Sequence, residues 1–276
     1  MNDTETRNDK NGSKIKKKFQ LFFWSIAGII FFILLWEIIS KSYASNILFP
    51  GPFLTLERFF NLLLSQRFYS SLWGSFLRVI AGILTAVPLG IIFGIACGMN
   101  KKASAFFRPL FSVIAATPVI SVILIIFIVM GSSRTPSFTA FLMIFPIVSS
   151  NVIEGIKSMD PCLTELFISF RMNKRETIKY LYMPFLSPFI LGALKSSLSL
   201  CWKVVVAAEV IVQPLFSLGL SMQNARIMLD TPELFALTLA TIIAAGLSQL
   251  ALSLAVRFIN PVYGKISHDS VKDSII

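Results

Sequence analysis

Long apolar runs separated by short polar stretches dominate the pattern of residues along this chain. Six runs of about 20 residues occur at 19–40, 72–98, 110–131, 137–156, 187–211 and 234–258. A helix of that length crosses the hydrocarbon core of a bilayer. The pattern therefore predicts an all-α integral membrane protein with six transmembrane helices. The composition agrees, because a chain that is 55% hydrophobic has too little polar surface to cover a soluble globule.

The segments outside the six runs are polar or amphipathic. Residues 1–18 are predicted to form a flexible basic tail, and residues 259–276 a second tail. The run at 19–40 is too long for the apolar part of a signal peptide and is read as an uncleaved span. Within 41–67, the helical spacing of Phe53, Leu56, Phe60 and Leu63 indicates a short interfacial helix, or a loop helix packed on the bundle.

Basic residues indicate the orientation of the transmembrane core at 68–258. Of the 25 Lys and Arg residues, 17 fall on one side of a six-span topology and five on the other. By the positive-inside rule, both termini and the loop at 157–186 are cytoplasmic. The same rule explains the net charge of +11, and no basic and aromatic cluster on a soluble domain suggests a nucleic acid partner.

The span at 72–98 carries small residues at every fourth position. These are Gly82, Ala86, Gly90, Gly94 and Gly98. Small residues on one helix face let a second helix approach closely, which drives association in lipid. We predict a helix-packing surface here; the alternative is a pore lining.

Four residues within the spans are candidates for a translocation pathway: Pro118, Asn151, Lys203 and Glu209. Proline can kink a membrane helix, and each ionisable group at the bilayer centre costs up to ~3.5 kcal/mol. The span at 187–211 therefore should not face lipid all round. In an alternative reading, Lys195 and Glu209 extend to water near the two ends and only Lys203 is interior.

Motifs for chemistry on this chain are absent from the sequence. No G-x-x-x-x-G-K-[ST] phosphate loop occurs, so any ATP would be hydrolysed by another chain. The only histidine is His268, and Cys97, Cys162 and Cys201 lack metal-site spacing. We expect no enzyme activity, no metal and no bound cofactor.

The loop at 157–186 has the pattern of two short helices. Asp160-Pro161 can begin a helix over 161–170, and Asn173 with Glu176 forms a capping-box pattern for one over 174–182. The first would carry an apolar stripe of Leu163, Leu166, Phe167 and Phe170. This stripe is suited to a groove on a partner, or to packing against the chain's own helices. Arg171 would lie in the turn between the two helices.

The same loop resembles the cytoplasmic coupling loop of bacterial ABC-importer permeases. Their Glu-Ala-Ala, Gly and Ile-x-Leu-Pro signature falls on Glu165, Leu166, Phe167, Arg171, Leu181, Met183 and Pro184. The Glu, the Pro and the spacing match, whereas both alanines and the Gly differ. The resemblance covers about residues 48–260, includes Arg78 to Gly82, and is closest to permeases for nitrate, sulfonates, taurine and thiamine-precursor pyrimidines.

This resemblance implies a type I ABC-importer permease in a bacterial plasma membrane. It would form a homodimer, bind two cytoplasmic ATPase subunits and receive a small solute from an extracytoplasmic substrate-binding protein. Two other classes stay open: a secondary transporter, and a channel or membrane scaffold. A secondary transporter usually shows repeated halves with matching broken helices, and no such repeat is found here.

Overall fold

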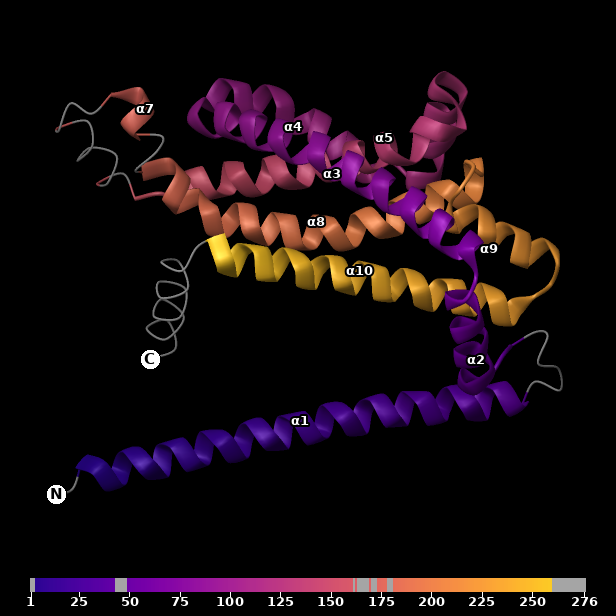
Figure 1. Ribbon diagram of the computed structural model, residues 1–276. Coiled ribbons are helices and arrows are strands. Elements are labelled where there is room, and N and C mark those ends of the chain that lie inside the picture. The colour runs from indigo at the N-terminus through magenta and orange to yellow at the C-terminus, as the bar shows by residue number, and fades with distance from the viewer. Residues whose placement is uncertain are drawn as a thin grey trace. The chain divides into compact units, whose positions relative to one another are not determined.

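The computed structural model describes residues 3–42, 49–160, 162, 169, 173–177 and 181–259, and in these ranges it contains helices and no strands (Figure 1). The helices are α1 Asp3–Ser42, α2 Pro52–Leu63, α3 Gln66–Met99, α4 Lys101–Ala116, α5 Val119–Lys157, α7 Lys174–Thr177, α8 Met183–Val212, α9 Leu218–Ile227 and α10 Thr231–Ile259. The predicted all-α class is confirmed.

Five helices in the described ranges are long and apolar enough to cross a membrane, rather than the six predicted. They are Phe23–Ser42, Gln66–Met99, Val119–Lys157, Met183–Val212 and Thr231–Val256. The difference arises at the third predicted span, 110–131, which is not one helix. Its first part belongs to α4 and its second part to α5, while the fourth predicted span forms the rest of α5.

Two local features cause this division. Pro118 lacks an N–H and disfavours helical geometry at the preceding residue, so α4 ends at Ala116 and Thr117 has an extended backbone with ψ 130°. Gly131 has φ 74° and ψ 174°, which interrupts α5 between the two predicted spans. Glycine adopts such a conformation at little steric cost. Pro118 thus separates two helices instead of kinking one.

Two predicted irregular segments are helical. The basic stretch after α3 forms the start of α4, where the Asn100 side chain accepts hydrogen bonds from the N–H groups of Lys102 at 3.0 Å and Ala103 at 3.3 Å. Residues 3–18, expected to be a flexible tail, continue α1 in the N-terminal direction. Extending an existing helix is easier than nucleating one, and lysine is a good helix former.

The chain divides into two compact units, the first comprising residues 1–62 with 225–236. Within it, Trp36 Nε1 donates to the Pro50 carbonyl at 3.0 Å, and Arg58 forms an ion pair with Asp230. The predicted amphipathic helix is α2, and its Phe53 and Phe60 side chains are 79% and 61% exposed. An exposed apolar stripe on a short helix is typical of an interfacial helix.

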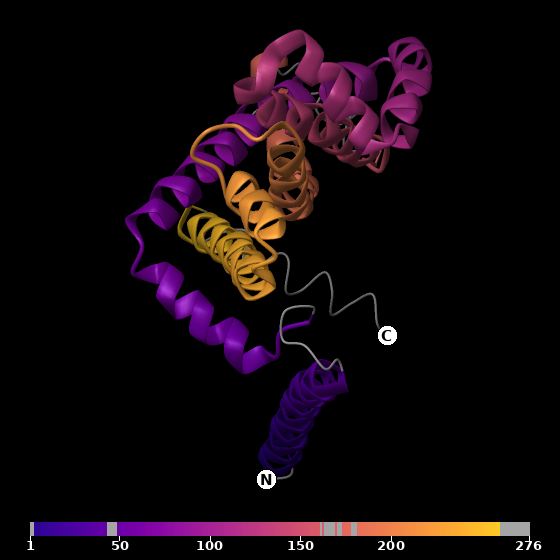
Figure 2. The ribbon, with the colours of Figure 1, turned by 90° about the vertical axis from the view of Figure 1, so that its right-hand side faces the viewer.

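The second unit, residues 63–224 with 237–276, contains the packed core of α3, α5 and α8, which lie side by side (Figure 1 and Figure 2). The small-residue row of α3 faces α5. A Cβ added to Gly82 would lie 2.9 Å from Ala140, and one added to Gly94 would lie 2.6 Å from Val152. Gly90 and Gly98 meet Val148 and Ile156 in the same way.

The partner on α5 is 58 positions further along the chain in each of these four contacts. We call this set of contacts the α3–α5 seam. Because residue numbers increase in the same direction on both sides, α3 and the second part of α5 run parallel. The chain must therefore return between residues 100 and 131, through α4 and the first part of α5. These two shorter helices take the place of the single third span that was predicted.

Candidate transport site

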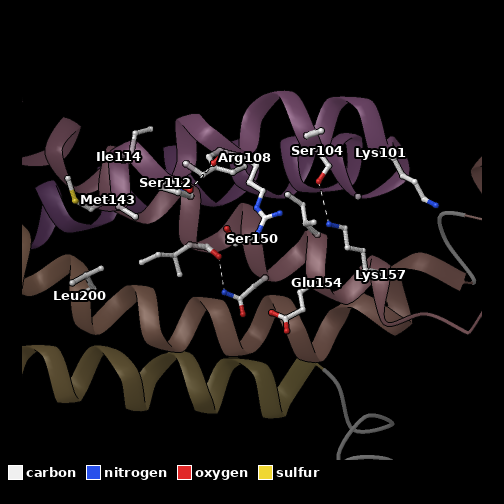
Figure 3. Close-up of a pocket in the computed structure, with 18 residues that line it drawn as sticks. Lys101, Ser104, Arg108, Ser112, Ile114, Met143, Ser150, Glu154, Lys157 and Leu200 are labelled. Carbon is white, nitrogen blue, oxygen red and sulfur yellow. Dashed lines mark hydrogen bonds between the residues drawn. The ribbon is translucent and has the colours of Figure 1, made fainter. Parts of the chain in front are cut away.

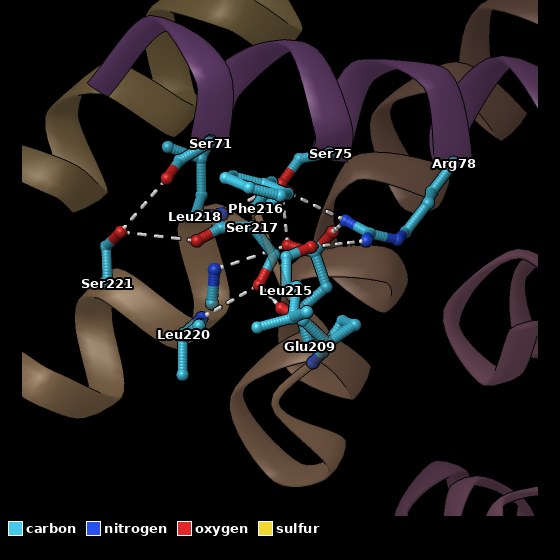
Figure 4. A network of polar contacts seen from close by, with 12 residues as sticks. Ser71, Ser75, Arg78, Glu209, Leu215, Phe216, Ser217, Leu218, Leu220 and Ser221 are labelled. Carbon is cyan, nitrogen blue, oxygen red and sulfur yellow. Dashed lines mark hydrogen bonds and ion pairs between the residues drawn. The ribbon is translucent and has the colours of Figure 1, made fainter. Parts of the chain in front are cut away.

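Glu209 on α8 is fully buried and is held by three donors from other segments (Figure 4). Its Oε1 accepts from Arg78 Nη1 at 3.0 Å, and its Oε2 accepts from Ser75 Oγ at 2.7 Å and from the Gly219 N–H at 3.2 Å. A buried carboxylate is stable only when it is paired and hydrogen-bonded. The network therefore joins α3, α8 and the start of α9.

Arg78 also fixes the turn at 213–217. Its guanidinium donates to the carbonyls of Leu215 at 2.9 Å and Phe216 at 3.1 Å. Gln213 and Phe216 have positive φ values of 49° and 51°, which is rare for a bulky residue such as phenylalanine. A Cβ on Gly74 would lie 2.0 Å from the Phe216 carbonyl oxygen, so the turn rests on the backbone of α3.

Burial along α8 reverses two of the sequence-based interpretations. Glu209 does not extend to water, because none of its surface is exposed. Lys195 and Lys203 are both exposed, so Lys203 is not an interior residue of the single chain. No role for Arg78 was predicted from the sequence. The signal available was its charge, since it is a cation within one predicted span and Glu209 is an anion within another.

Lys203 lies on an exposed face of α8 that also carries Gly192, Ser196 and Ala207. The spacings of four, seven and four residues place all of them on one side of the helix. A Cβ on Gly192 would meet nothing within 4 Å. Lys203 forms no hydrogen bond or ion pair with any residue in the described ranges. We call these four residues the α8 polar face, after its two polar side chains, Ser196 and Lys203.

A cavity of about 1220 Å³ lies between α4, α5 and neighbouring parts of α3 and α8 (Figure 3). Cationic Lys101, Arg108 and Lys157 line it together with Glu154. Asn151, one of the four pathway candidates, also lines this cavity, and its Nδ2 donates to the Ile147 carbonyl at 2.8 Å. The other candidates lie elsewhere: Pro118 precedes α5, and Lys203 and Glu209 are on α8.

Part of the predicted coupling loop can be located. The Asp160 side chain accepts from the Cys162 N–H at 2.9 Å, and the Glu176 side chain accepts from the Asn173 N–H at 2.9 Å. Met183 and Pro184 begin α8, with Met183 68% exposed. The remaining coupling candidates lie outside the described residues: Leu163, Glu165, Leu166, Phe167, Phe170 and Arg171.

Residues 86–265 match the sequence model of the family described as "Binding-protein-dependent transport system inner membrane component". A bicarbonate transport system permease protein, CmpB of Synechococcus elongatus, is 26% identical over 240 residues, which cover 80% of this chain and 84% of CmpB. The taurine transport system permease protein TauC of Escherichia coli is 25% identical over 237 residues, covering 84% and 86%.

The fold is also similar to that of a solved transport protein. The crystal structure of a bacterial ABC transporter involved in the import of the acidic polysaccharide alginate matches with a TM-score of 0.58. The match covers 92% of this chain and 99% of that one at 14% identity. At this identity the similarity concerns the fold alone.

Proposed function

Since this chain belongs to the family of binding-protein-dependent inner-membrane transport components, we propose that two copies of it form the path by which an ATP-driven importer carries a small solute with an oxyanion group. Membership makes it the multi-pass permease of an ABC importer, which works with an ATPase and a substrate-binding protein. Beyond family membership, we propose that two copies of this chain form a homodimer, that they line the path, and that the solute carries an oxyanion group.

The α8 polar face is the observation that carries this proposal. An ionisable side chain left in lipid near the bilayer centre costs up to ~3.5 kcal/mol. Lys203 lies nine residues before the end of the 30-residue helix α8 and has no partner among the described residues. A second copy related by a twofold axis would present the same face and enclose both Lys203 side chains. The side chains would then border a polar path instead of lipid.

The charge of Lys203 and the names of the relatives support the substrate class. The two relatives are named for bicarbonate and taurine, and these solutes share an oxyanion group. Two ammonium groups beside one path would attract such a group and repel a cation. Delivery by the binding protein would still determine which oxyanion enters.

The 157–186 loop is the proposed contact with the ATPase. Its apolar stripe of Leu163, Leu166, Phe167 and Phe170 would enter a groove on that subunit. The excess of basic residues at the predicted inner side supports a cytoplasmic position for this loop and for both termini.

Transport by the reconstituted importer tests the proposal. Vesicles containing this chain, the ATPase and the binding protein should take up taurine or bicarbonate only with ATP. Lys203→Met should lower the uptake rate by about tenfold or more, because one lost charged interaction of ~1.4 kcal/mol corresponds to tenfold. Lys102→Met, which removes an exposed cation at the start of α4, should leave uptake unchanged.

Two results would contradict the proposal. Unchanged uptake by the Lys203→Met variant would show that the α8 polar face does not border the path. Uptake by vesicles without the ATPase would instead fit a secondary transporter or a channel.

A further inference from the structure

The cavity between α4 and α5 has a charged end and an apolar end. Lys101 and Lys157 lie toward one end, Arg108 lies near the middle, and Ile114, Met143 and Leu200 lie toward the other end (Figure 3). A pathway for a small hydrophilic solute does not need such an apolar wall. The separation of charged from apolar surface in this cavity therefore requires another explanation.

Within the described ranges, the cations that line the cavity have no carboxylate partner. Neither Lys101 nor Arg108 forms an ion pair with any residue that the structure describes. Among the described residues, Lys157 Nζ donates a hydrogen bond only to Ser104 Oγ, at 3.4 Å. Glu154, the one carboxylate of the lining, likewise has no ion pair within the described ranges. Three cations against one carboxylate leave an excess of positive charge.

The two ends also differ in their depth along the helices. Lys101 is the first residue of α4 and Lys157 the last residue of α5. Ile114 lies 13 residues from Lys101 and Met143 lies 14 residues from Lys157, which is about 20 Å of helix in both cases. Lys101 and Lys157 are therefore at the ends of the two helices, Arg108 is about midway along α4, and the apolar end is deeper along both helices. A phospholipid has the same order of polarity along the membrane normal.

We propose that this cavity binds an amphiphilic oxyanion, with its head among Lys101, Arg108 and Lys157 and its apolar chain against Ile114, Met143 and Leu200. Guanidinium and ammonium groups form charge-assisted hydrogen bonds with phosphate, sulfonate or carboxylate oxygens. An anionic phospholipid of the inner leaflet and a transported organic anion share this chemistry. The proposal does not depend on transport, because binding can be measured on the isolated chain.

Binding of short-chain lipids to the purified full chain in an uncharged detergent tests the site. Native mass spectrometry should show phosphatidylglycerol binding more tightly than phosphatidylcholine of the same chain length. Arg108→Gln with Lys157→Gln should weaken phosphatidylglycerol binding by about tenfold or more, since each charged contact contributes up to about tenfold. Lys102→Gln is the matched control, because Lys102 is exposed on α4 but does not line the cavity, and its affinity should stay within about twofold.

A change at the apolar end gives a second, independent readout. Ala115 lines the cavity, and Ala115→Trp should fill its apolar part and weaken phosphatidylglycerol binding. Inorganic phosphate should bind far more weakly than the lipid in the unaltered chain. Displacement of the lipid by hexanesulfonate would identify a transported organic anion as a ligand of the same site, whereas no displacement would assign the cavity to lipid.

Three outcomes would overturn the proposal. Equal binding of phosphatidylglycerol and phosphatidylcholine would remove the role of the charged head. If Lys102→Gln lost as much phosphatidylglycerol affinity as the double variant, the lipid would not be bound in the cavity. Equal binding of inorganic phosphate and lipid would show that the apolar chain does not contribute to binding. Gel filtration and thermal unfolding of each variant would show whether the chain is still folded.

Discussion

The Glu209 carboxylate and the Arg78 guanidinium form an ion pair that the surrounding helices close off from solvent. Glu209 has no exposed surface, and the side chain of Arg78 is 15% exposed. The Arg58–Asp230 pair has a shorter distance of 2.6 Å, but its side chains are 45% and 26% exposed. Solvent screening makes exposed pairs weak, whereas removing one partner of a buried pair leaves an uncompensated charge.

Removing Arg78 should therefore destabilise the protein much more than removing Arg58. We expect Arg78→Met to lower the free energy of unfolding by ~3–5 kcal/mol and Arg58→Met by ~0–1 kcal/mol. Thermal unfolding of the purified variants in detergent would measure both. The double variant Arg78→Met, Glu209→Gln should recover part of the loss, because the second change removes the unpaired charge. Equal destabilisation by the two single variants would contradict this ranking.

Charged residues in a span could be identified from the sequence, but their neighbours could not. The free-energy cost of Lys203 and Glu209 predicts that α8 does not face lipid all round. Helical periodicity gives the angle between two residues on α8, yet it does not say which helix covers either one. Arg78 is 131 residues from Glu209 in the chain. Only the packing of α3 against α8 shows that the two meet.

At the scale of the elements, the α3–α5 seam depends on the absence of side chains from one helix. Val148 and Val152 on α5 are fully buried where Gly90 and Gly94 leave room for them. The contact residues are spaced by multiples of four on both helices. Each glycine therefore packs against a branched or small side chain at the same level along the helix axis. In lipid, this close contact replaces the hydrophobic drive that soluble helices have.

A methyl group at the centre of the seam should force α3 and α5 apart. A Cβ on Gly94 would lie 2.6 Å from Val152 Cβ and 3.0 Å from the Ser149 carbonyl oxygen, which cannot move without shifting α5. We expect Gly94→Ala to lower the free energy of unfolding by ~1–3 kcal/mol. Gly246→Ala on α10 is the control, since no atom outside the local helix backbone lies within 4 Å of the added Cβ. It should be neutral or stabilising by up to ~1 kcal/mol.

The coupling loop can be tested at its apolar stripe. Phe167→Asp should release the ATPase from the permease, because a carboxylate in an apolar groove must be desolvated without a partner. A pull-down of the ATPase by the tagged permease would measure this, with thermal unfolding as a check that the permease is intact. Cys162→Asp is the matched control, since Cys162 is exposed on the same loop. Retention of the ATPase by the Phe167→Asp variant at the unaltered level would argue against the docking role.

Hydropathy located the apolar segments but not the breaks within them. Averaging over a window treats 110–131 as one run, whereas backbone geometry divides it at Thr117 and again interrupts α5 at Gly131. Caps were easier to anticipate because they depend on adjacent residues. Asp160 and Glu176 accept the backbone hydrogen bonds that their spacing predicts. Asn100 is a further N-cap that could have been found, since it stands between an apolar run and a lysine pair.

For the whole molecule, both the helical class and the importer family followed from the sequence. The family match covers residues 86–265, and the resemblance in the sequence spans about 48–260. The crossings follow a simple physical rule, since each apolar run must span and each polar stretch must leave the bilayer. Substrate identity does not follow from this rule, because any small solute is compatible with a bundle of membrane-spanning helices.

The orientation of the chain can be measured by cysteine labelling in intact cells. Asn46→Cys and Asn224→Cys should react with an impermeant maleimide from outside, and Lys174→Cys only after the membrane is opened, because the positive-inside rule places the 157–186 loop in the cytoplasm. Cys162 is exposed and should first be replaced by Ser, whereas Cys97 and Cys201 are buried. Labelling of the Lys174→Cys variant in intact cells would show that the 157–186 loop faces outside and would contradict the predicted topology.

The Arg78–Glu209 pair also sets a condition on how the protein is made. The ribosome completes α3 long before it reaches Glu209, and at about 5–20 residues per second the 131 additions from Arg78 to Glu209 take roughly 7–26 s. In the later part of that interval Arg78 has left the ribosome, while its carboxylate partner has not yet been made. The other apolar residues of α3 must offset the cost of the unpaired guanidinium until α8 arrives. Membrane insertion of α3 and completion of its packing are therefore separate events in time.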